Sequence, residues 1–450
     1  MDKNDLTQGS ILKKLGLFFF PILFGMLFQQ LYNTVDAVIV GKCVGPAALA
    51  AVGGSPAVIV NLVIGFFTGL ASGASVIISQ YFGCRDRERL LQAEHTILLF
   101  CLLVGLLLTA LGLVSADWSL RLVKTPEDIL ADSARYLRIY YVGAAPLLLF
   151  SIGSGVLRAV GDSRRPLLFL GVCCALNIAL DLLFVAWLSM GVVGAAWATV
   201  ISQSVSAVLV LRHLHFADPL LRLEFSRLRI YPAALRRILY IGVPAGLQSA
   251  MYSVSNLIIQ AAVNDLGTTV VAAWTAVGKY DGLYWVVSNS FGAAICTFVG
   301  QNYGAGLFDR MKKGIRLWLL VALGTSVAIS GLLIGFSDLG FRLFTDDAAV
   351  IREASAMLWY FVPFYFIWSF IEVISNSLRG AGDSFRPMLI ILCGVCLLRI
   401  VYIALMIPQW HTVLSVSLSY PISWTLTALV FTVYYLRGSW LKRLLAHAST

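Results

Sequence analysis

Asp36 stands in a run of apolar residues long enough to cross a membrane, and Asn177 and Asp181 occupy a second such run. Residues 15–41 would rise about 40 Å as a helix. An ionisable side chain in such a run costs roughly 2.5–3.5 kcal/mol on insertion scales, so it normally faces a bundle interior or a wet cavity. Two carboxylates that repel each other there favour uptake of a proton, and their oxygens also form a cage suited to a sodium ion.

The spacing of the second pair supports the same chemistry. Asn177 and Asp181 are four residues apart, so on a helix they share one face and can hydrogen-bond or hold one cation together. If both helices run outward from the cytoplasm, Asp36 lies about 33 Å and Asp181 about 24 Å from its start, which places both acids in the outer half of the membrane. The alternative is a structural acid satisfied by a neighbouring amide.

The composition requires membrane-spanning helices to position these residues. The chain has 450 residues, of which 59% are hydrophobic and 12% charged, and its mean hydropathy is +0.85. Because a bilayer offers no water to backbone groups, long apolar segments must be helices, and we expect an all-α polytopic membrane protein with twelve of them. The expected spans are residues 15–41, 48–82, 92–116, 133–158, 166–188, 191–212, 238–264, 270–303, 315–337, 354–378, 387–408 and 412–436.

The net charge of +10 follows the expected topology. Most of the 33 Lys and Arg residues fall at the two ends of the chain and in the loops after even-numbered helices. The positive-inside rule then places both termini in the cytoplasm, and the charge excess gives no reason to expect a nucleic-acid partner. The first apolar run is too long for a signal peptide, so we expect it to remain as the first helix.

The sequence also contains an internal repeat. Residues 157–166 recur as 378–387, an offset of 221, and both segments follow the pattern RxxGDSxxP. Two further pairs recur near this offset: Gln80 with Gly83 as Gln301 with Gly304, and Pro21 with Asn33 as Pro244 with Asn256. This register predicts two homologous six-helix halves, and because six is even they are related by an axis along the membrane normal.

These halves define the expected domains. We expect an N-terminal lobe of residues 1–212 that carries the cation site, a cytoplasmic linker of 213–237, and a C-terminal lobe of 238–450. The linker mixes Leu and Ile with several Arg residues, so we expect it to lie on the anionic inner leaflet, at about 1 kcal/mol per basic residue. A regulatory site in the linker is the alternative.

The second half carries a different set of charges, namely Lys279, Asp281, Glu372 and Arg399. Their formal charges sum to zero, which suits structural ion pairs, and we expect Arg399 to pair with Asp281. Contact with substrate is the alternative, and nearby aromatic residues could line a drug cavity through cation–π contacts. In the first half, Pro21 removes a backbone donor, so we expect the first helix to bend there when the cation binds.

This chain resembles the MATE (multidrug and toxic compound extrusion) transporters, in particular their bacterial DinF-like branch. The resemblance rests on the two halves, the RxxGDSxxP turns, the sequence from Pro21 to Asp36 and the segment 176–181. The resemblance covers essentially the whole chain. It implies an antiporter of the bacterial cytoplasmic membrane that exports cationic or amphipathic drugs in exchange for H⁺ or Na⁺. It also implies a cation site at Asp36, Asn177, Asp181 and Thr199. Residues 248–252 lack the glutamate of the NorM-like branch.

Two other functions compete with the exporter. A flippase for lipid-linked precursors, from the same superfamily, would want several arginines in its cavity, whereas only Lys279 and Arg399 lie within expected spans. An enzyme is disfavoured because the sequence has no HExxH, GxSxG or Walker A motif. We expect no cofactor besides the coupling ion, small molecules and the bilayer as partners, and a monomer.

Overall fold

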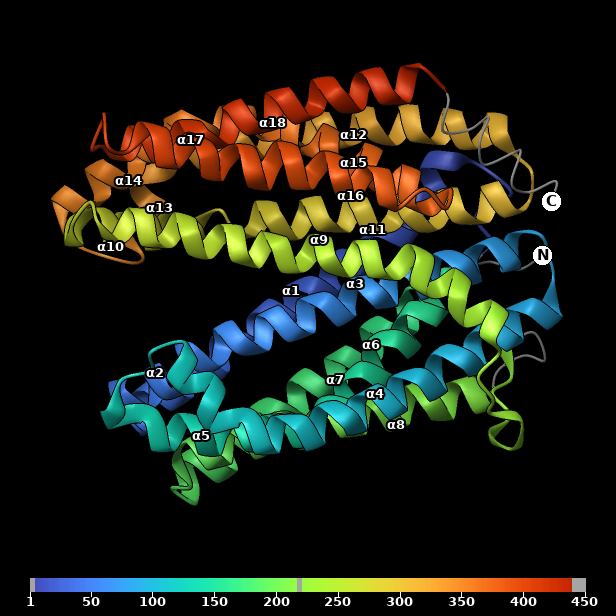
Figure 1. Ribbon diagram of the computed structural model, residues 1–450, viewed down its shortest axis with the longest axis horizontal. Coiled ribbons are helices and arrows are strands. Elements are labelled where there is room, and N and C mark those ends of the chain that lie inside the picture. The colour runs from blue at the N-terminus through green and yellow to red at the C-terminus, as the bar shows by residue number, and fades with distance from the viewer. Residues whose placement is uncertain (1–4, 217–220, 439–450) are drawn as a thin grey trace. The chain divides into compact units, whose positions relative to one another are not determined.

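The computed structural model describes residues 5–216 and 221–438, and every regular element in this part of the chain is a helix. Figure 1 labels these elements. In the first half they are α1 (Ile11–Cys43), α2 (Pro46–Gly53), α3 (Ser55–Gly83), α4 (Arg87–Leu122), α5 (Glu127–Val142), α6 (Ala144–Ala159), α7 (Arg164–Asp181), η1 (Leu182–Trp187), α8 (Gly191–His215) and η3 (Phe225–Arg227). In the second they are α9 (Pro232–Asn264), α10 (Thr268–Tyr280), α11 (Gly282–Gly304), α12 (Phe308–Gly335), α13 (Ser337–Arg342), α14 (Ala348–Phe361), η4 (Val362–Phe364), α15 (Tyr365–Gly380), α16 (Phe385–Ile391), η5 (Leu392–Leu397), α17 (Leu398–Met406) and α18 (Val413–Leu436).

The membrane spans agree with the expected all-α architecture. Ten helices of the described chain are long and apolar enough to cross a membrane, and the pair α5 and α6, which meets at a bend of 49°, makes eleven. The remaining expected span, 238–264, is the second part of α9, a 33-residue helix with more polar residues. Several expected single helices consist of two consecutive elements, as in α2 with α3 and α10 with α11.

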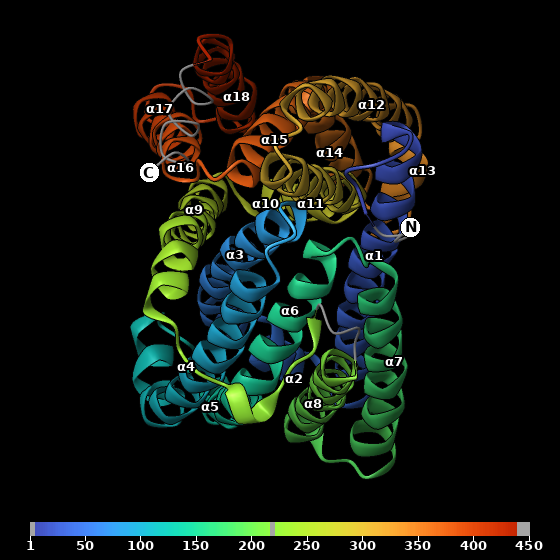
Figure 2. The ribbon, with the colours of Figure 1, turned by 90° about the vertical axis from the view of Figure 1, so that its right-hand side faces the viewer.

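The helices form two compact units. Unit 1 contains Leu17–Gly246, and unit 2 contains Leu6–Gly16 together with the chain from Leu247 onward. The expected lobes were divided at 213–237, whereas the structural boundary falls inside α9; residues 1–4, 217–220 and 439–450 of those expected segments lie outside the described residues. Figure 2 looks nearly along the helices and shows α7 beside α8 within unit 1.

Helices α1 and α9 are each shared between the two units, and each carries a proline close to the point of change. Pro21 lies inside α1 shortly after Leu17, and Pro244 lies inside α9 just before Gly246. Since proline removes a backbone hydrogen bond, these are positions where a long helix can bend.

The first part of α9 is held in unit 1 by glycines on two helices. A Cβ atom on Gly69 of α3 would lie 2.4 Å from the backbone nitrogen of Gly246, and one on Gly73 would lie 2.4 Å from Cα of Gly242. Each helix thus presents a GxxxG pair, which lets two backbones approach closely in a membrane. Figures 1 and 2 both show α3 beside α9.

The repeated RxxGDSxxP segments form matching turns. Gly161 and Gly382 have φ values of 87° and 103°, a conformation that side chains other than glycine rarely adopt. The aspartate after each glycine pairs with an arginine three residues later: Asp162 with Arg165 at 2.9 Å, and Asp383 with Arg386 at 3.3 Å. The two halves therefore begin α7 and α16 in the same way.

Part of the linker is fixed to unit 1 by hydrogen bonds from its backbone. The N–H of Glu224 donates to Nε2 of His95 at 3.2 Å, and the N–H of Tyr231 donates to the hydroxyl of Thr96 at 3.1 Å. Both acceptors lie on α4. Contacts with this helix therefore hold the linker in place, in addition to any contact that it makes with the membrane surface.

Candidate functional site

The structure places all four residues of the expected cation site in the interior of unit 1. Asp36 lies on α1, Asn177 and Asp181 on the last turns of α7, and Thr199 on α8. Their exposed fractions are 9%, 0%, 0% and 5%. They are therefore cut off from bulk water. The fold brings α1 to the consecutive helices α7 and α8, from which it is far apart in sequence.

Asp36 and Asp181 are brought close enough for one carboxyl group to hydrogen-bond the other when one is protonated. No described residue donates a hydrogen bond to Oδ1 of Asp36 or to either carboxylate oxygen of Asp181. Both polar atoms of the Asn177 side chain also lack a hydrogen-bond partner within residues 5–216 and 221–438. Burying such groups unpaired is costly, so the cluster is arranged to take up a positive charge, as a proton or a cation.

Thr199 contributes differently. Its hydroxyl donates to the carbonyl oxygen of Ala195, one turn earlier on α8, at 3.1 Å. That bond uses the hydrogen and leaves oxygen lone pairs available to accept from or coordinate another group.

The helix that carries Asp181 changes its geometry immediately after this residue. α7 ends at Asp181, and the next six residues, Leu182–Trp187, form the π-helix η1. π-helical turns are rare and occur frequently at functional sites. Hydrophobic periodicity predicts a single apolar helix over 166–188 and contains no signal for this change.

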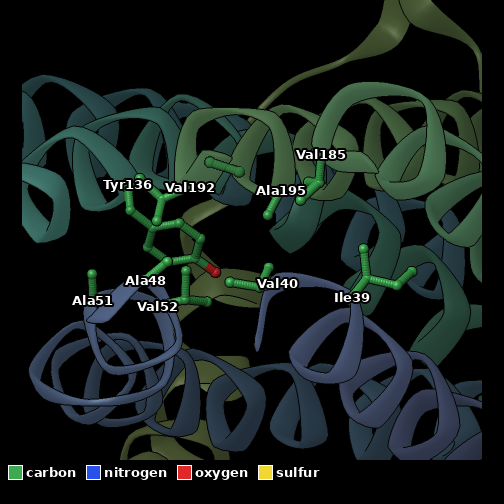
Figure 3. Packing of buried hydrophobic residues seen from close by; sticks show 10 residues of the cluster. Ile39, Val40, Ala48, Ala51, Val52, Tyr136, Val185, Val192 and Ala195 are labelled. Carbon is green, nitrogen blue, oxygen red and sulfur yellow. The ribbon is translucent and has the colours of Figure 1, made fainter. Parts of the chain in front are cut away.

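An apolar cluster packs near the acid pair, drawn from four helices and η1. Its members are Ile39, Val40, Ala48, Ala51, Val52, Tyr136, Val185, Val192, Ala195 and Ala196. In Figure 3 the ring of Tyr136 lies among Ala48, Val52 and Val192, with its hydroxyl directed to the side of Val40. Tyr136 also interacts electrostatically with both Asp36 and Asp181. Such packing excludes water, which strengthens charge interactions at the pair.

Other polar residues of this region were missed by the sequence analysis. Gln203 on α8 interacts with the hydroxyls of Tyr32 and Tyr140, and Tyr32 also interacts with Asp36. A usable signal was present, because Gln203 lies four residues after Thr199 and therefore shares its helix face.

Unit 2 contains a cavity of about 630 Å³. Three of the four charged residues expected to form a second-half cluster line it: Asp281, Glu372 and Arg399. Lys279 is exposed and is not among the lining residues. The cavity also has aromatic walls, formed by Tyr252, Trp274, Trp285, Phe361, Trp368, Tyr420 and Trp424.

The expected ion pair between Asp281 and Arg399 is not formed among the described residues. Asp281 instead accepts hydrogen bonds from the Tyr365 hydroxyl at 2.6 Å and from the Trp285 indole at 3.0 Å. Arg399 lies 4.0 Å from the ring centroid of Tyr420 and donates to Ser423 at 3.2 Å. Aromatic neighbours thus contact both charges, and the sequence analysis did not consider them as partners. Oδ1 of Asp281 and Nε of Arg399 receive no hydrogen-bond partner from the described part of the chain.

The third lining charge, Glu372, faces a polar part of the cavity. Its carboxylate accepts a hydrogen bond from Asn376 at 2.8 Å, and Arg379 interacts with it electrostatically while donating to Gln248 at 3.0 Å. A Cβ atom on Gly292 would lie 2.3 Å from Oε1 of Glu372, so any other residue there would require the carboxylate to move from its present position.

A bundle of membrane-length helices built from two related halves, with buried unpaired acids in one and a cavity in the other, has the architecture of a secondary transporter. Comparison with known proteins identifies the family: the MatE family model matches residues 21–183 and 244–405, once in each half, and the chain belongs to this family. It is therefore a membrane transporter and not an enzyme.

The similarity extends over whole chains. The sequence is 29% identical to a probable multidrug resistance protein of Bacillus subtilis, YpnP, over 98% of both chains, and 28% identical to a second, YoeA, over 95% of this chain and 94% of the relative. A solved structure of a multidrug resistance MATE family transporter in an outward-facing conformation matches with a TM-score of 0.91 at 23% identity, covering 100% of this chain and 99% of the other. That likeness shows the shared fold.

Proposed function

We propose that this protein is an ion-coupled antiporter that exports cationic or amphipathic small molecules across a bacterial cytoplasmic membrane by alternating access. The coupling ion is H⁺ or Na⁺, bound in unit 1 at Asp36, Asn177, Asp181 and Thr199. The observation that carries the proposal is the buried pair of Asp36 and Asp181, in which three of the four carboxylate oxygens accept no hydrogen bond from any described residue. A bound proton or sodium ion offsets the repulsion between them.

Substrate is bound in the cavity of unit 2. An aromatic wall attracts an organic cation through its π faces, and Asp281 and Glu372 supply negative charge beside it. The names of the Bacillus relatives, multidrug resistance proteins, agree with a cavity that selects by shape and charge type. The cavity does not favour the flippase alternative, because Arg379 and Arg399 are balanced by the two carboxylates.

The proposed orientation places both termini in the cytoplasm, with the transporter acting as a monomer and without a further cofactor. The positive-inside distribution of Lys and Arg supports this orientation. In that orientation Asp36 and Asp181 lie toward the outer face, so the coupling ion enters from outside and substrate leaves in the opposite direction.

Transport by everted vesicles tests the proposal. Everted vesicles that contain the protein are given a fluorescent organic cation in the outside medium. Its uptake is then measured under an imposed pH gradient and, in a separate experiment, under an imposed sodium gradient. Uptake under one of the two gradients identifies the coupling ion. If neither gradient drives uptake in vesicles with normal expression, the result contradicts ion coupling. An ionophore that dissipates the imposed gradient serves as the control.

A further inference from the structure

A second groove lies on the outside of unit 2, between α16 and α18, and the transport mechanism does not use it. It has a volume of about 620 Å³. Its walls are apolar and outward-facing: Leu389 is 39% exposed, and Leu429, Val430 and Val433 are each 50% to 58% exposed. In a membrane these side chains meet lipid tails, so the groove is a place where an acyl chain fits.

Two arginines stand at one end of this groove. Arg386 is the second residue of α16, and Arg437 directly follows the last residue of α18. Both therefore lie where a membrane span begins or ends, at the level of lipid head groups. Arg386 pairs with Asp383, whereas Arg437 forms no ion pair with any residue in the described part of the chain. The mouth of the groove thus carries excess positive charge.

A hydrogen-bond network fixes the shape of this mouth. The carboxylate of Asp383 accepts from the Arg386 guanidinium and also from the hydroxyl of Tyr434, which lines the groove. The turn that begins α16 is therefore tied to the end of α18, and Arg386 is held at the groove instead of moving freely in solvent.

The first half contains the same RxxGDSxxP turn, but different side chains occupy the positions that line the groove in the second half. By the offset of 221, Asp162 and Arg165 correspond to Asp383 and Arg386, and His213 corresponds to Tyr434. The position of Ile390 is taken by Phe169, whose ring lies 6.0 Å from that of His213. The position of Arg437 is taken by Phe216, which lies under the guanidinium of Arg212. The first half thus has the aromatic Phe216 where the second half has Arg437, and its nearby arginine, Arg212, lies over that ring.

We propose that this groove is a binding site for one anionic phospholipid of the cytoplasmic leaflet, with an acyl chain along Leu389, Leu429 and Val430 and its phosphate between Arg386 and Arg437. Basic pockets between transmembrane helices on the cytoplasmic side are suited to such head groups. The leaflet follows from the proposed orientation of the chain, but the site itself is independent of the ion coupling and of the substrate cavity.

The test is native mass spectrometry of the purified full-length protein, equilibrated with phosphatidylglycerol or with phosphatidylcholine. The wild type is expected to retain one phosphatidylglycerol in preference to phosphatidylcholine. Arg437→Gln should lower that preference about fivefold, which corresponds to about 1 kcal/mol for one basic residue near the surface. Val430→Trp, which fills the groove, should reduce retention of both lipids. Arg212→Gln, an exposed arginine at the corresponding end of α8, is the matched control and should change nothing.

Equal retention of the two lipids by the wild type would overturn the proposal. So would an unchanged preference in Arg437→Gln, or a loss in Arg212→Gln as large as that in Arg437→Gln, since the latter would indicate a general effect of surface charge. Gel-filtration profiles and cation transport of each variant, measured alongside, establish that the proteins are folded. Transport is expected to persist because none of the three residues lies in the cation site or in the cavity of unit 2.

Discussion

The two halves of this protein treat their buried charges in opposite ways. In unit 1, Asp36 and Asp181 face each other, and no described residue donates to three of their four carboxylate oxygens. In unit 2, one carboxylate oxygen of Asp281 accepts from two aromatic donors and Arg399 rests on the face of Tyr420, so each charge has partners even though Oδ1 of Asp281 and Nε of Arg399 have none among the described residues. A buried charge that already has partners gains little from binding an ion, whereas an unpaired one gains much. This contrast is the basis for the proposed division of roles, with ion coupling in the first copy of the fold and substrate binding in the second.

Removing the unpaired acid in unit 1 is the most severe way to break this division. Asp36→Asn keeps the shape of the side chain and removes the charge that takes up a cation, so uphill efflux should fall to the background of empty vesicles while expression stays normal. Asp181→Asn should behave alike. The double variant should be little worse than either single one, because the two groups act as a unit. Wild-type resistance in cells that express Asp36→Asn would contradict the assignment.

Removing a paired acid in unit 2 should have a different kind of effect. Asp281→Asn weakens the attraction of the cavity for a cation, and we expect the KM for a fluorescent cation to rise about tenfold, or about 1.4 kcal/mol, with the ion-to-substrate ratio unchanged. Lys279→Gln is the control, since Lys279 is exposed and does not line the cavity. A changed ion ratio in Asp281→Asn would place coupling in both halves.

The proline of α1 sharpens the comparison, because this helix carries Asp36 and we predict that ion binding bends it at Pro21. Pro21→Ala restores a backbone hydrogen bond and should lower transport severalfold, while ion binding to the purified protein, measured by calorimetry, stays the same. Pro421→Ala is a matched control inside α18, a helix that belongs to one unit. If Pro21→Ala and Pro421→Ala transport equally well, the bend in α1 is incidental.

The smallest expected effect concerns the aromatic partner of Arg399. Tyr420→Leu removes the ring beneath the guanidinium and should destabilise the purified protein by about 1–2 kcal/mol, seen as a lower midpoint of thermal unfolding. Tyr420→Phe keeps the ring and should unfold close to the wild-type midpoint. A rescue of Arg399→Asp by Asp281→Arg would instead support the direct ion pair that the structure does not contain.

Composition and repeat were sufficient to predict the class of fold. Long apolar runs require helices in a bilayer whatever they pack against. A repeat with an offset of 221 residues indicates a duplication, and it can be recognised in the sequence without knowing which residues are in contact. The two family matches, at residues 21–183 and 244–405, confirm the duplication. The sequence also singled out Asp36 and Asp181, because an acid is conspicuous within an apolar run.

Tertiary structure decided which of these charges meet. Helical periodicity reports the face on which a residue lies, but it does not report which helix covers that face, so it could not show that Asp36 meets Asp181 or that Asp281 meets Tyr365 instead of Arg399. The π-helix after Asp181 and the change of unit within α1 and α9 are equally silent in the sequence, because both result from contacts between helices that are distant along the chain. The residue types were local information, and their partners were set by packing.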